Sequence, residues 1–372
     1  MFTKVLIANR GEIAVRIIRA CHELGIQTVA VYSEAVREAL HTQLATQAIC
    51  IGPAKASDSY LNMTSILSAA VVTGAQAIHP GFGFLSENSA FATMCEEMNI
   101  RFIGPSSTII DLMGNKANAR KTMIAAGVPV TPGSEGYISS YEEAVVQAEK
   151  IGYPVILKAA AGGGGKGMRK VYQENGLEAA FSQAKAEAKA AFGDDSMYLE
   201  KIITPARHIE VQILGDSFGN VVHLGERDCS LQRNHQKVLE ESPSTFISEE
   251  TRKDMGDVAI RAAKHVGYTN AGTIEFLVDT EQRFYFMEMN TRIQVEHPVT
   301  EMATGIDIVK EQLRIASGEP LSFTQDEVVI TGHTIECRIN AENPALGFRP
   351  SSGKIDYLFL PEGKVAEFAE HC

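Results

Sequence analysis

Two glutamates in separate apolar segments are the residues best suited to carry chemistry. Glu275 lies in TIEFLV and Glu288 in FYFMEMN, each among apolar neighbours. A tight turn centred on Glu281 and Gln282 would place these two carboxylates directly opposite each other, and like charges at about 5 Å destabilise a sheet. A divalent cation with oxygen ligands, Mg²⁺ or Mn²⁺, removes this conflict. The alternatives are a register that is off by one residue, or an arginine partner, such as Arg292, for one of the carboxylates.

The segment that follows Glu288 has polar residues at alternate positions, as an extended strand would present them. Glu288, Asn290, Arg292, Gln294 and Glu296 would share one face of that strand, and Met289, Ile293 and Val295 the other. A solvent-facing strand gives the same pattern. Because the metal pair would begin this face, we interpret Glu296 as a candidate general base and Arg292 as a candidate anion holder.

The run GGGGKG at residues 162–167 lies between two predicted strands. Glycines let the backbone fold closely around phosphate oxygens, and Lys166 adds a positive charge. A flexible hairpin tip is the alternative, and the run is not a Walker A loop because no GK[ST] follows. Lys158 and Lys116 are further phosphate candidates, although a lone lysine is more often a solvated charge.

The segment ERDCSLQRNHQK at residues 226–237 gathers side chains suited to an anionic substrate or a nucleotide. They are Arg227, Gln232, Arg233, His235 and Lys237. His235 has no ligand at metal-binding spacing, and a surface histidine is an equal alternative. RHIEVQ puts His208, Glu210 and Gln212 on one strand face, which alone is ambiguous.

The elements that must position these residues begin with a βαβ unit. Residues 4–8 and 27–33 read as parallel strands joined by a helix over 13–24. Residues 75–88 run from a short strand into a glycine-rich turn, where ligands of open α/β sheets bind. The turn after the first strand lacks the GxGxxG dinucleotide fingerprint.

The second half of the chain has a different pattern. Residues 109–126 read as one helix, residues 153–160 and 168–172 as strands, and residues 177–191 as a helix. Residues 197–293 are rich in strands, with one helix near 249–265, which predicts a mixed sheet of the α+β class. Residues 331–341 begin a third structural unit.

Composition excludes several classes of protein. The 372 residues are 45% hydrophobic, so they can form a core, and the formal net charge of −12 argues against holding nucleic acid by bulk charge. The six cysteines show no paired spacing, which is typical of a reducing compartment. Since no apolar run approaches the roughly 20 residues of a membrane span, we expect a cytoplasmic protein with no membrane contact.

Five motifs together resemble biotin carboxylase, and the resemblance runs from residue 4 to about residue 358. They are IANRGEIA (7–14), HPGFGFLSEN (79–88), GGGGKGM (162–168), ERDCSLQRNHQK (226–237) and EMNTRIQVEHPVTE (288–301). The sequence is most similar to the separate biotin carboxylase subunit of bacterial acetyl-CoA carboxylase.

This resemblance implies an ATP-grasp fold, with α/β and α+β parts. The expected domains are an N-terminal parallel-sheet domain at 1–113, an ATP-grasp domain at 114–317 with a mobile glycine-loop lid at about 131–200, and a C-terminal domain that starts at 331–372. The family continues beyond position 372, so this third domain is expected to be incomplete.

The resemblance also implies roles for individual residues. ATP phosphates would be held by Lys116, Lys158, Gly162, Gly163, Gly164, Gly165, Lys166 and Gly167. Adenine would meet Glu200, Lys201 and Ile203, with His208, Gln232 and His235 near the nucleotide. Metal would be bound by Glu275, Glu288 and Asn290, and bicarbonate by Lys237, Arg292, Gln294 and Val295. Glu296 would be the base, and Arg338 would steady the biotin enolate.

The implied reaction is ATP-dependent carboxylation of biotin by bicarbonate through carboxyphosphate, the first half-reaction of acetyl-CoA carboxylase in fatty acid synthesis. It implies ATP, two Mg²⁺ or Mn²⁺ ions, biotin on a carrier protein, carboxyltransferase partners and a homodimer. The alternatives are a module of a pyruvate or propionyl-CoA carboxylase, another ATP-grasp ligase that ignores biotin, and a catalytically impaired ATP-binding fragment.

Overall fold

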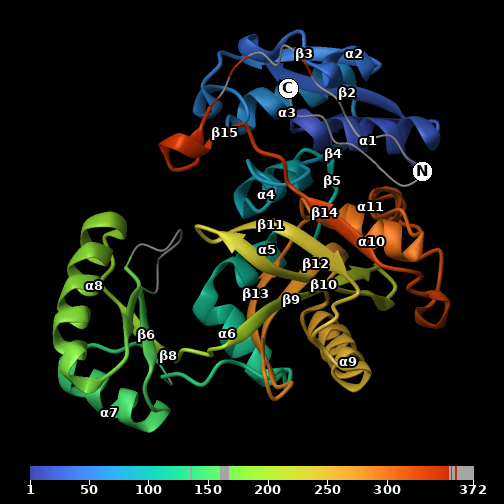
Figure 1. The fold of residues 1–372 in the computed structure, drawn as a ribbon. Coiled ribbons are helices and arrows are strands. Elements are labelled where there is room, and N and C mark those ends of the chain that lie inside the picture. The colour runs from blue at the N-terminus through green and yellow to red at the C-terminus, as the bar shows by residue number, and fades with distance from the viewer. Residues whose placement is uncertain (135, 160–166, 352, 354–356, 358–372) are drawn as a thin grey trace.

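The computed structural model describes residues 1–134, 136–159, 167–351, 353 and 357. The glycine run from Gly162 to Lys166 and most of the last twenty residues lie outside this part of the chain. Figure 1 shows the N-terminal unit, a larger six-stranded sheet and a smaller unit built around β6.

The N-terminal unit is a five-stranded parallel sheet with the order β3-β2-β1-β4-β5. Its strands are β1 Lys4–Ile7, β2 Gln27–Ser33, β3 Gln47–Gly52, β4 Ala77–His79 and β5 Arg101–Phe102. Its helices are α1 Gly11–Glu23, α2 Leu40–Leu44, α3 Met63–Thr73 and α4 Ser89–Glu97. The predicted βαβ unit is confirmed, because apolar residues at helical spacing, such as Ile13, Ile17 and Cys21, bury one face of α1.

The predicted single helix over residues 109–126 is wrong, because two helices occupy this stretch. They are α5 Ser107–Gly114 and α6 Lys116–Ala125. Between them Asn115 has an extended backbone, and its side chain accepts hydrogen bonds from the backbone N–H groups of Ala117 and Asn118. This N-cap starts a new helix whose first residue is Lys116.

A smaller unit has a three-stranded antiparallel sheet with the order β7-β6-β8. Its elements are α7 Tyr141–Ile151, β6 Val155–Ala159, β7 Arg169–Val171, α8 Leu177–Phe192 and β8 Met197–Lys201. The two helices pack on the sheet through their own apolar core, which includes Ala144, Ala148 and Leu177. The unit stands apart from the larger sheets in Figure 1, joined through the segments around β8 and α6.

The third sheet has six strands in the order β13-β12-β9-β10-β11-β14. Its strands are β9 Ala206–Gly215, β10 Val221–Arg233, β11 Gln236–Ser242, β12 Asn270–Asp279, β13 Phe284–Asn290 and β14 Thr334–Cys337. All neighbours in this sheet are antiparallel, so the predicted mixed sheet is wrong. Strand β14, from the piece expected to open a third unit, pairs with β11 and completes this sheet.

Three helices accompany the six-stranded sheet, and short elements connect the rest. The helices are α9 Glu249–Val266, α10 His297–Thr304 and α11 Ile308–Ala316. The short elements are the hairpin β15 Glu342–Asn343 and β16 Arg349–Pro350, and the 3₁₀ turns Glu34–Val36, Ala56–Asp58, Glu174–Gly176, Gln325–Glu327 and Pro344–Leu346. Within the described residues, no helix has the length and apolar character needed to cross a membrane.

The N-terminal unit and the six-stranded sheet share one apolar core. Ile13 and Ile17 of α1 belong to the same buried cluster as Leu313 of α11 and Ala271 of β12. Arg16 lies at this boundary and forms ion pairs with Glu301 and Asp307. The two units are therefore packed together closely enough for loops of the first to reach side chains of the second.

Candidate active site

The candidate site is a row of charged side chains across neighbouring strands of the six-stranded sheet. The register places Glu288 of β13 opposite Glu275 of β12, Glu275 opposite Glu210 of β9, and Glu210 opposite Arg227 of β10. Residues that are directly opposite each other point to the same face of a sheet. Three carboxylates and one guanidinium therefore line up on one face.

The predicted pairing of Glu275 with Glu288 is confirmed, but the turn that produces it differs from the prediction. The register shifts just beyond the pair, so that Phe276 lies opposite Phe286, and Met287 is the extra residue of a β-bulge. The bulge restores the predicted register at the two glutamates. The alternative of an off-register pair is therefore wrong.

Glu275 is buried, and its two oxygens contact different groups. Oε1 accepts hydrogen bonds from Asn290, Gln294 and Lys237, at 2.7, 3.0 and 3.0 Å. Oε2 lies 2.8 Å from Nε2 of His208. Burial alone would raise the pKa of this carboxyl, but His208 and Lys237 outweigh it and the pKa is lowered.

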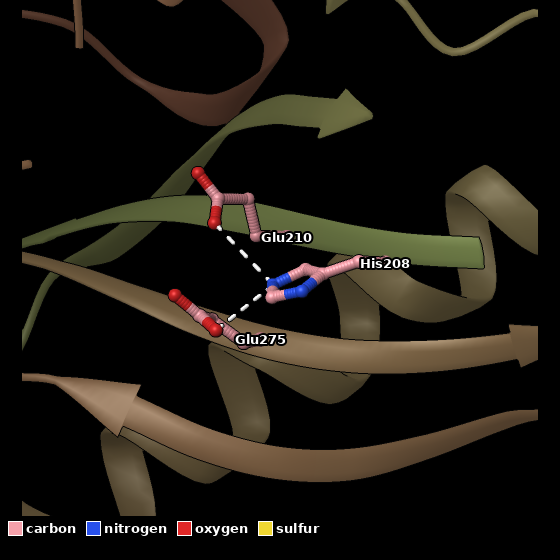
Figure 2. A group of neighbouring side chains, drawn as sticks. All are labelled: His208, Glu210 and Glu275. Carbon is pink, nitrogen blue, oxygen red and sulfur yellow. Dashed lines mark ion pairs between the residues drawn. The ribbon is translucent and has the colours of Figure 1, made fainter. Parts of the chain in front are cut away.

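Figure 2 shows the His208 ring between Glu210 and Glu275. Its Nε2 is 3.9 Å from Glu210, and its Nδ1 is 3.0 Å from the side-chain amide of Gln232. Burial lowers the pKa of His208, but the contact with Glu275 raises it more, so that the pKa is raised overall. His208 therefore adds a polar ring beside the row of carboxylates.

Lys237 joins three carboxylates that come from different elements. Its Nζ donates to Glu210 at 2.5 Å, to Glu275 at 3.0 Å and to Glu296 at 2.6 Å. Burial lowers the pKa of Lys237, but the three carboxylates outweigh this effect and raise it. The ammonium group is thus charged and held at one point of the site.

Arg227 lies beneath this cluster and is fully buried. Its five N–H donors are all used, because they donate to Glu210, Gln212, Thr300, Thr273 and Gln294. The interpretation of Arg227 as part of an anion- or nucleotide-binding group is therefore wrong. It holds Glu210 and Gln294 in place instead.

The predicted extended strand through Glu296 ends at Asn290. The chain turns there, and Glu296 lies at the N-cap of α10, with Pro298 in the first turn. Pro is favoured at the start of a helix, and this signal opposes a continued strand. Gln294 and Glu296 nevertheless both point into the site.

Glu296 is 2% exposed and lies between two cations. Oε1 accepts from Lys237 at 2.6 Å, and Oε2 accepts from Arg338 at 2.8 Å. Arg338 follows β14, so the edge strand of the sheet supplies the second cation. A buried carboxylate between two cations is suited to accept a proton from a ligand held by the same cations.

Arg292 does not pair with either glutamate of the hairpin, so the alternative of an arginine partner is wrong. Each glutamate instead has a lysine beside it, because Lys237 pairs with Glu275 and Lys116 with Glu288. The Nε of Arg292 donates to Glu87 at 2.9 Å, and an NH2 group donates to Oδ1 of Asn290 at 3.2 Å. Glu87 also accepts from the backbone N–H of Thr291. The motif HPGFGFLSEN therefore reaches the site through Glu87. Val295, between Gln294 and Glu296, is half-buried.

Glu288 and Lys116 lie at the more open end of the row. Their charged atoms are 3.5 Å apart, and the Glu288 side chain is 40% exposed. The oxygens of Glu275, Glu288 and Asn290 come from two neighbouring strands and are the hard ligands that Mg²⁺ takes. This donor set fits a divalent cation, and it lies beside the Lys116 ammonium at the more exposed end of the row.

Several predicted nucleotide-binding residues lie on the small three-stranded sheet. Lys158 of β6 pairs with Glu200 of β8, and Arg120 is 3.7 Å from the same carboxylate. The Lys201 ammonium donates to the backbone oxygens of residues 152 and 153, so its charge is already satisfied there. Ile203, just beyond β8, is half-buried.

Gly167 is the one described residue of the predicted phosphate loop. Its φ is +70°, and a Cβ at this position would lie 2.8 Å from the Cβ of Ala159. Both facts require glycine here.

The hairpin between β10 and β11 carries Gln232 and His235. Gln232 donates to His208 and to the backbone oxygen of Cys229. His235 is exposed in the turn, with φ of +63°. Arg233 forms an ion pair with Glu342 and lies under the Phe348 ring, so it does not face the charged row.

Sequence reasoning left the role of Glu210 ambiguous and missed Glu87 and Glu240. Glu210 could have been found, because a fully buried strand seldom carries an acid without a partner. Glu87 and Glu240 gave no comparable signal, since their partners Arg292 and Arg338 lie far along the chain.

Comparison with known proteins identifies two matching families. Residues 1–110 match the family described as the N-terminal domain of biotin carboxylase, and residues 115–324 match the ATP-binding domain of the carbamoyl-phosphate synthase L chain. Biotin carboxylase 1 of Bacillus subtilis is 60% identical over 364 residues, which cover 98% of this chain and 81% of that protein.

Two solved structures have the same fold. A biotin carboxylase–ATP complex from Campylobacter jejuni superposes with a TM-score of 0.95 at 52% identity, and the match covers 100% of this chain and 83% of that one. The biotin carboxylase domain dimer of 2-oxoglutarate carboxylase from Hydrogenobacter thermophilus, in complex with MgADP, ADP and bicarbonate, gives a TM-score of 0.91 at 54% identity. That match covers 98% of this chain and 80% of the other.

Proposed function

This chain belongs to the biotin carboxylase family of ATP-grasp ligases, and from that premise we propose that it carboxylates biotin on a carrier protein as the first half-reaction of acetyl-CoA carboxylase in fatty acid synthesis. The observation that carries the proposal is the buried Glu296 between Lys237 and Arg338. This arrangement offers an acceptor for a proton beside cations that can hold a small anion.

In the proposed first step, bicarbonate loses its proton to Glu296, and its oxygen attacks the γ-phosphorus of ATP. The P–O bond to ADP breaks, and carboxyphosphate forms. Lys237, Arg292, Gln294 and Val295 hold the bicarbonate. Lys237 suits this role because it is already charged and fixed by three carboxylates.

In the second step, carboxyphosphate separates into CO₂ and phosphate. The phosphate takes the proton from N1 of biotin, and N1 attacks the CO₂. Arg338 steadies the negative charge on the biotin ureido oxygen while N1 is deprotonated. The guanidinium lies beside Glu296, which brings this charge next to the bicarbonate pocket.

ATP is held between the six-stranded sheet and the small unit. We assign residues 131–200 as the lid and 1–113, 114–317 and 331–372 as the domain ranges. Lys116 and Lys158 would contact phosphates with the loop from Gly162 to Gly167. Glu200, Lys201 and Ile203 would line the adenine side, with His208, Gln232 and His235 near the nucleotide.

Glu275, Glu288 and Asn290 would hold Mg²⁺, which neutralises charge on the phosphate oxygens when bound. The three side chains supply oxygens from adjacent strands, and Asn290 already contacts Glu275. Mn²⁺ takes the same ligands, so activity with either metal is expected.

The test is ADP release from Mg-ATP, with and without bicarbonate and with and without free biotin. Stimulation that requires both compounds supports the proposal. Turnover that needs bicarbonate but ignores biotin would favour another ATP-grasp ligase. ATP binding without any turnover would favour a catalytically impaired fragment.

A second candidate is the biotin carboxylase module of a different carboxylase. The similarity to the domain of 2-oxoglutarate carboxylase favours it, since that domain shares 54% identity with this chain. Both candidates carboxylate biotin and differ in their partners. Carboxybiotinylated carrier protein should be offered to acetyl-CoA, propionyl-CoA, pyruvate and 2-oxoglutarate carboxyltransferases in turn, and light scattering should test the proposed homodimer.

A further inference from the structure

Two glutamates outside the row of charged side chains face each other across the edge of the six-stranded sheet. Glu240 of β11 lies directly opposite Glu336 of β14. Glu240 is fully buried, and Glu336 is half-buried. Two ionised carboxylates at the roughly 5 Å Cβ separation of opposed residues repel each other strongly.

Within the described residues, Arg338 is the one cation in contact with Glu240, which is too little to stabilise two negative charges. Oε2 of Glu240 and Oε2 of Glu336 are buried without a hydrogen bond, and Oε1 of Glu240 has only the ion pair with Arg338. Burial raises the pKa of Glu240 to about 7 and that of Glu336 to about 8. Two carboxyls in this position can share one proton, which removes the repulsion.

Arg338 connects this pair to Glu296. Its Nε lies 2.9 Å from Oε1 of Glu240, and its NH2 donates to Oε2 of Glu296 at 2.8 Å. The guanidinium therefore stands between two competing carboxylates. How strongly Glu240 attracts it depends on whether the pair carries one negative charge or two.

The charged groups around the pair come from every element packed against it. They are Arg338 beyond β14, Glu296 at the start of α10, Lys237 on β11, Glu210 on β9 and Arg227 on β10. Lys237 and Arg227 are both paired with Glu210, and Arg338 alone among these groups contacts Glu240 directly.

We propose that Glu240 and Glu336 share one proton and position Arg338 for its role with biotin, so that loss of this proton draws Arg338 toward Glu240 and weakens biotin carboxylation. The proposal rests on the proposed function, because it concerns the residue assigned there to the biotin enolate. Glu240 and Glu336 are positioning residues, since they act through Arg338.

The first test detects the shared proton directly. Infrared difference spectra of the full chain, titrated from pH 5 to pH 10, should show a protonated carboxyl band that disappears between about pH 7 and pH 8. The band should be lost in Glu336→Gln and in Glu240→Gln. It should remain in the matched control Glu241→Gln, which lies on the same strand but contacts His333 at the surface.

The second test measures how loss of this proton changes kcat/KM for biotin. In the wild type, kcat/KM for biotin should fall about tenfold per pH unit above pH 8, as loss of a single proton requires. Glu336→Gln should abolish this fall, and its KM for ATP should stay within twofold of the wild type. The control Glu241→Gln should keep the wild-type profile.

Three outcomes would overturn the proposal. They are the absence of a protonated carboxyl band above pH 6 in the wild type, persistence of the band in both variants, and an unchanged pH profile in a folded Glu336→Gln. If the wild type shows no biotin-dependent turnover at any pH, the proposed function fails, and the infrared titration alone decides whether the pair shares a proton.

Discussion

Glu296 is the residue whose surroundings are most specific for proton transfer. Replacing it with Gln keeps its size and its place at the N-cap of α10 but removes the proton acceptor. We expect the biotin-dependent rate of ADP formation to fall by at least about 100-fold, the contribution typical of a general base. Calorimetry should show ATP binding within about threefold of the wild type.

The control for this variant is Glu301→Gln. Glu301 lies on the same helix and pairs with Arg16 at the boundary of the N-terminal unit, away from Lys237. It should leave the rate within a few-fold of the wild type. Equal losses in both variants would show that α10 matters structurally, and would remove the argument for Glu296 as the base.

Replacing Arg227 should lower the free energy of unfolding of the protein. In Arg227→Met, Glu210 loses one of its two cationic partners inside the sheet, and breaking a buried pair in this way costs about 3–5 kcal/mol. Urea unfolding should show this loss. Lys253→Met removes an exposed ion pair with Asp257 on α9 and should leave the unfolding midpoint nearly unchanged.

At the scale of single elements, the start of α6 connects helix capping to nucleotide binding. Asn115 caps the helix, and the next residue, Lys116, is a proposed phosphate ligand. Asn115→Ala should cost about 1 kcal/mol of stability and raise KM for ATP several-fold, because the first turn then frays. Asn62→Ala removes the cap of α3 in the N-terminal unit and should lower stability without changing KM.

Helices and strands were predicted correctly where the residue pattern of one segment was enough to determine its structure. The βαβ unit is of this kind, because hydrophobic periodicity determines it. The pairing of Glu275 with Glu288 was predicted from a turn that lies elsewhere, and the bulge at Met287 restores the predicted register. The continued strand through Glu296 was wrong, since alternating polarity outweighed the helix-start signal of Pro298. The break at Asn115 was missed for a similar reason, although Asn is a favoured N-cap.

The arrangement of the site could not be predicted from such local signals. Lys237 meets carboxylates from β9, β12 and α10 only because β9 lies between β10 and β12 in the sheet. Strand order is decided by tertiary packing. The pattern of residues within one segment therefore does not show which strands will be its neighbours. The full burial of Arg227 follows from the same order, and so does the contact of Arg338 with Glu296.

At the scale of the whole molecule, two buried histidines couple stability to pH. His79 of β4 and His297 of α10 are both buried, and burial lowers the pKa of His79 to about 3 and that of His297 to about 4. Between pH 6.5 and pH 4 the unfolded chain binds protons that the folded chain does not. The free energy of unfolding therefore falls as the pH falls through this window.

This effect should be on the order of 3 kcal/mol for each histidine at the acid end of the window. Urea unfolding at several pH values should show it as a steep decline below pH 6.5. His297→Gln should reduce the slope by about one bound proton. His265→Gln, at the exposed end of α9, should keep the wild-type slope, and an equal change in both variants would contradict the assignment.

The strand order also has a consequence for the nascent chain. One edge of β9 pairs with β10, which follows at once, but the other edge pairs with β12, which begins only at Asn270. A ribosome that adds about 5–20 residues per second leaves this apolar edge open for several seconds. The β9 edge is therefore open to mispairing during translation, and Glu210 and Glu275 meet only when synthesis has passed β12.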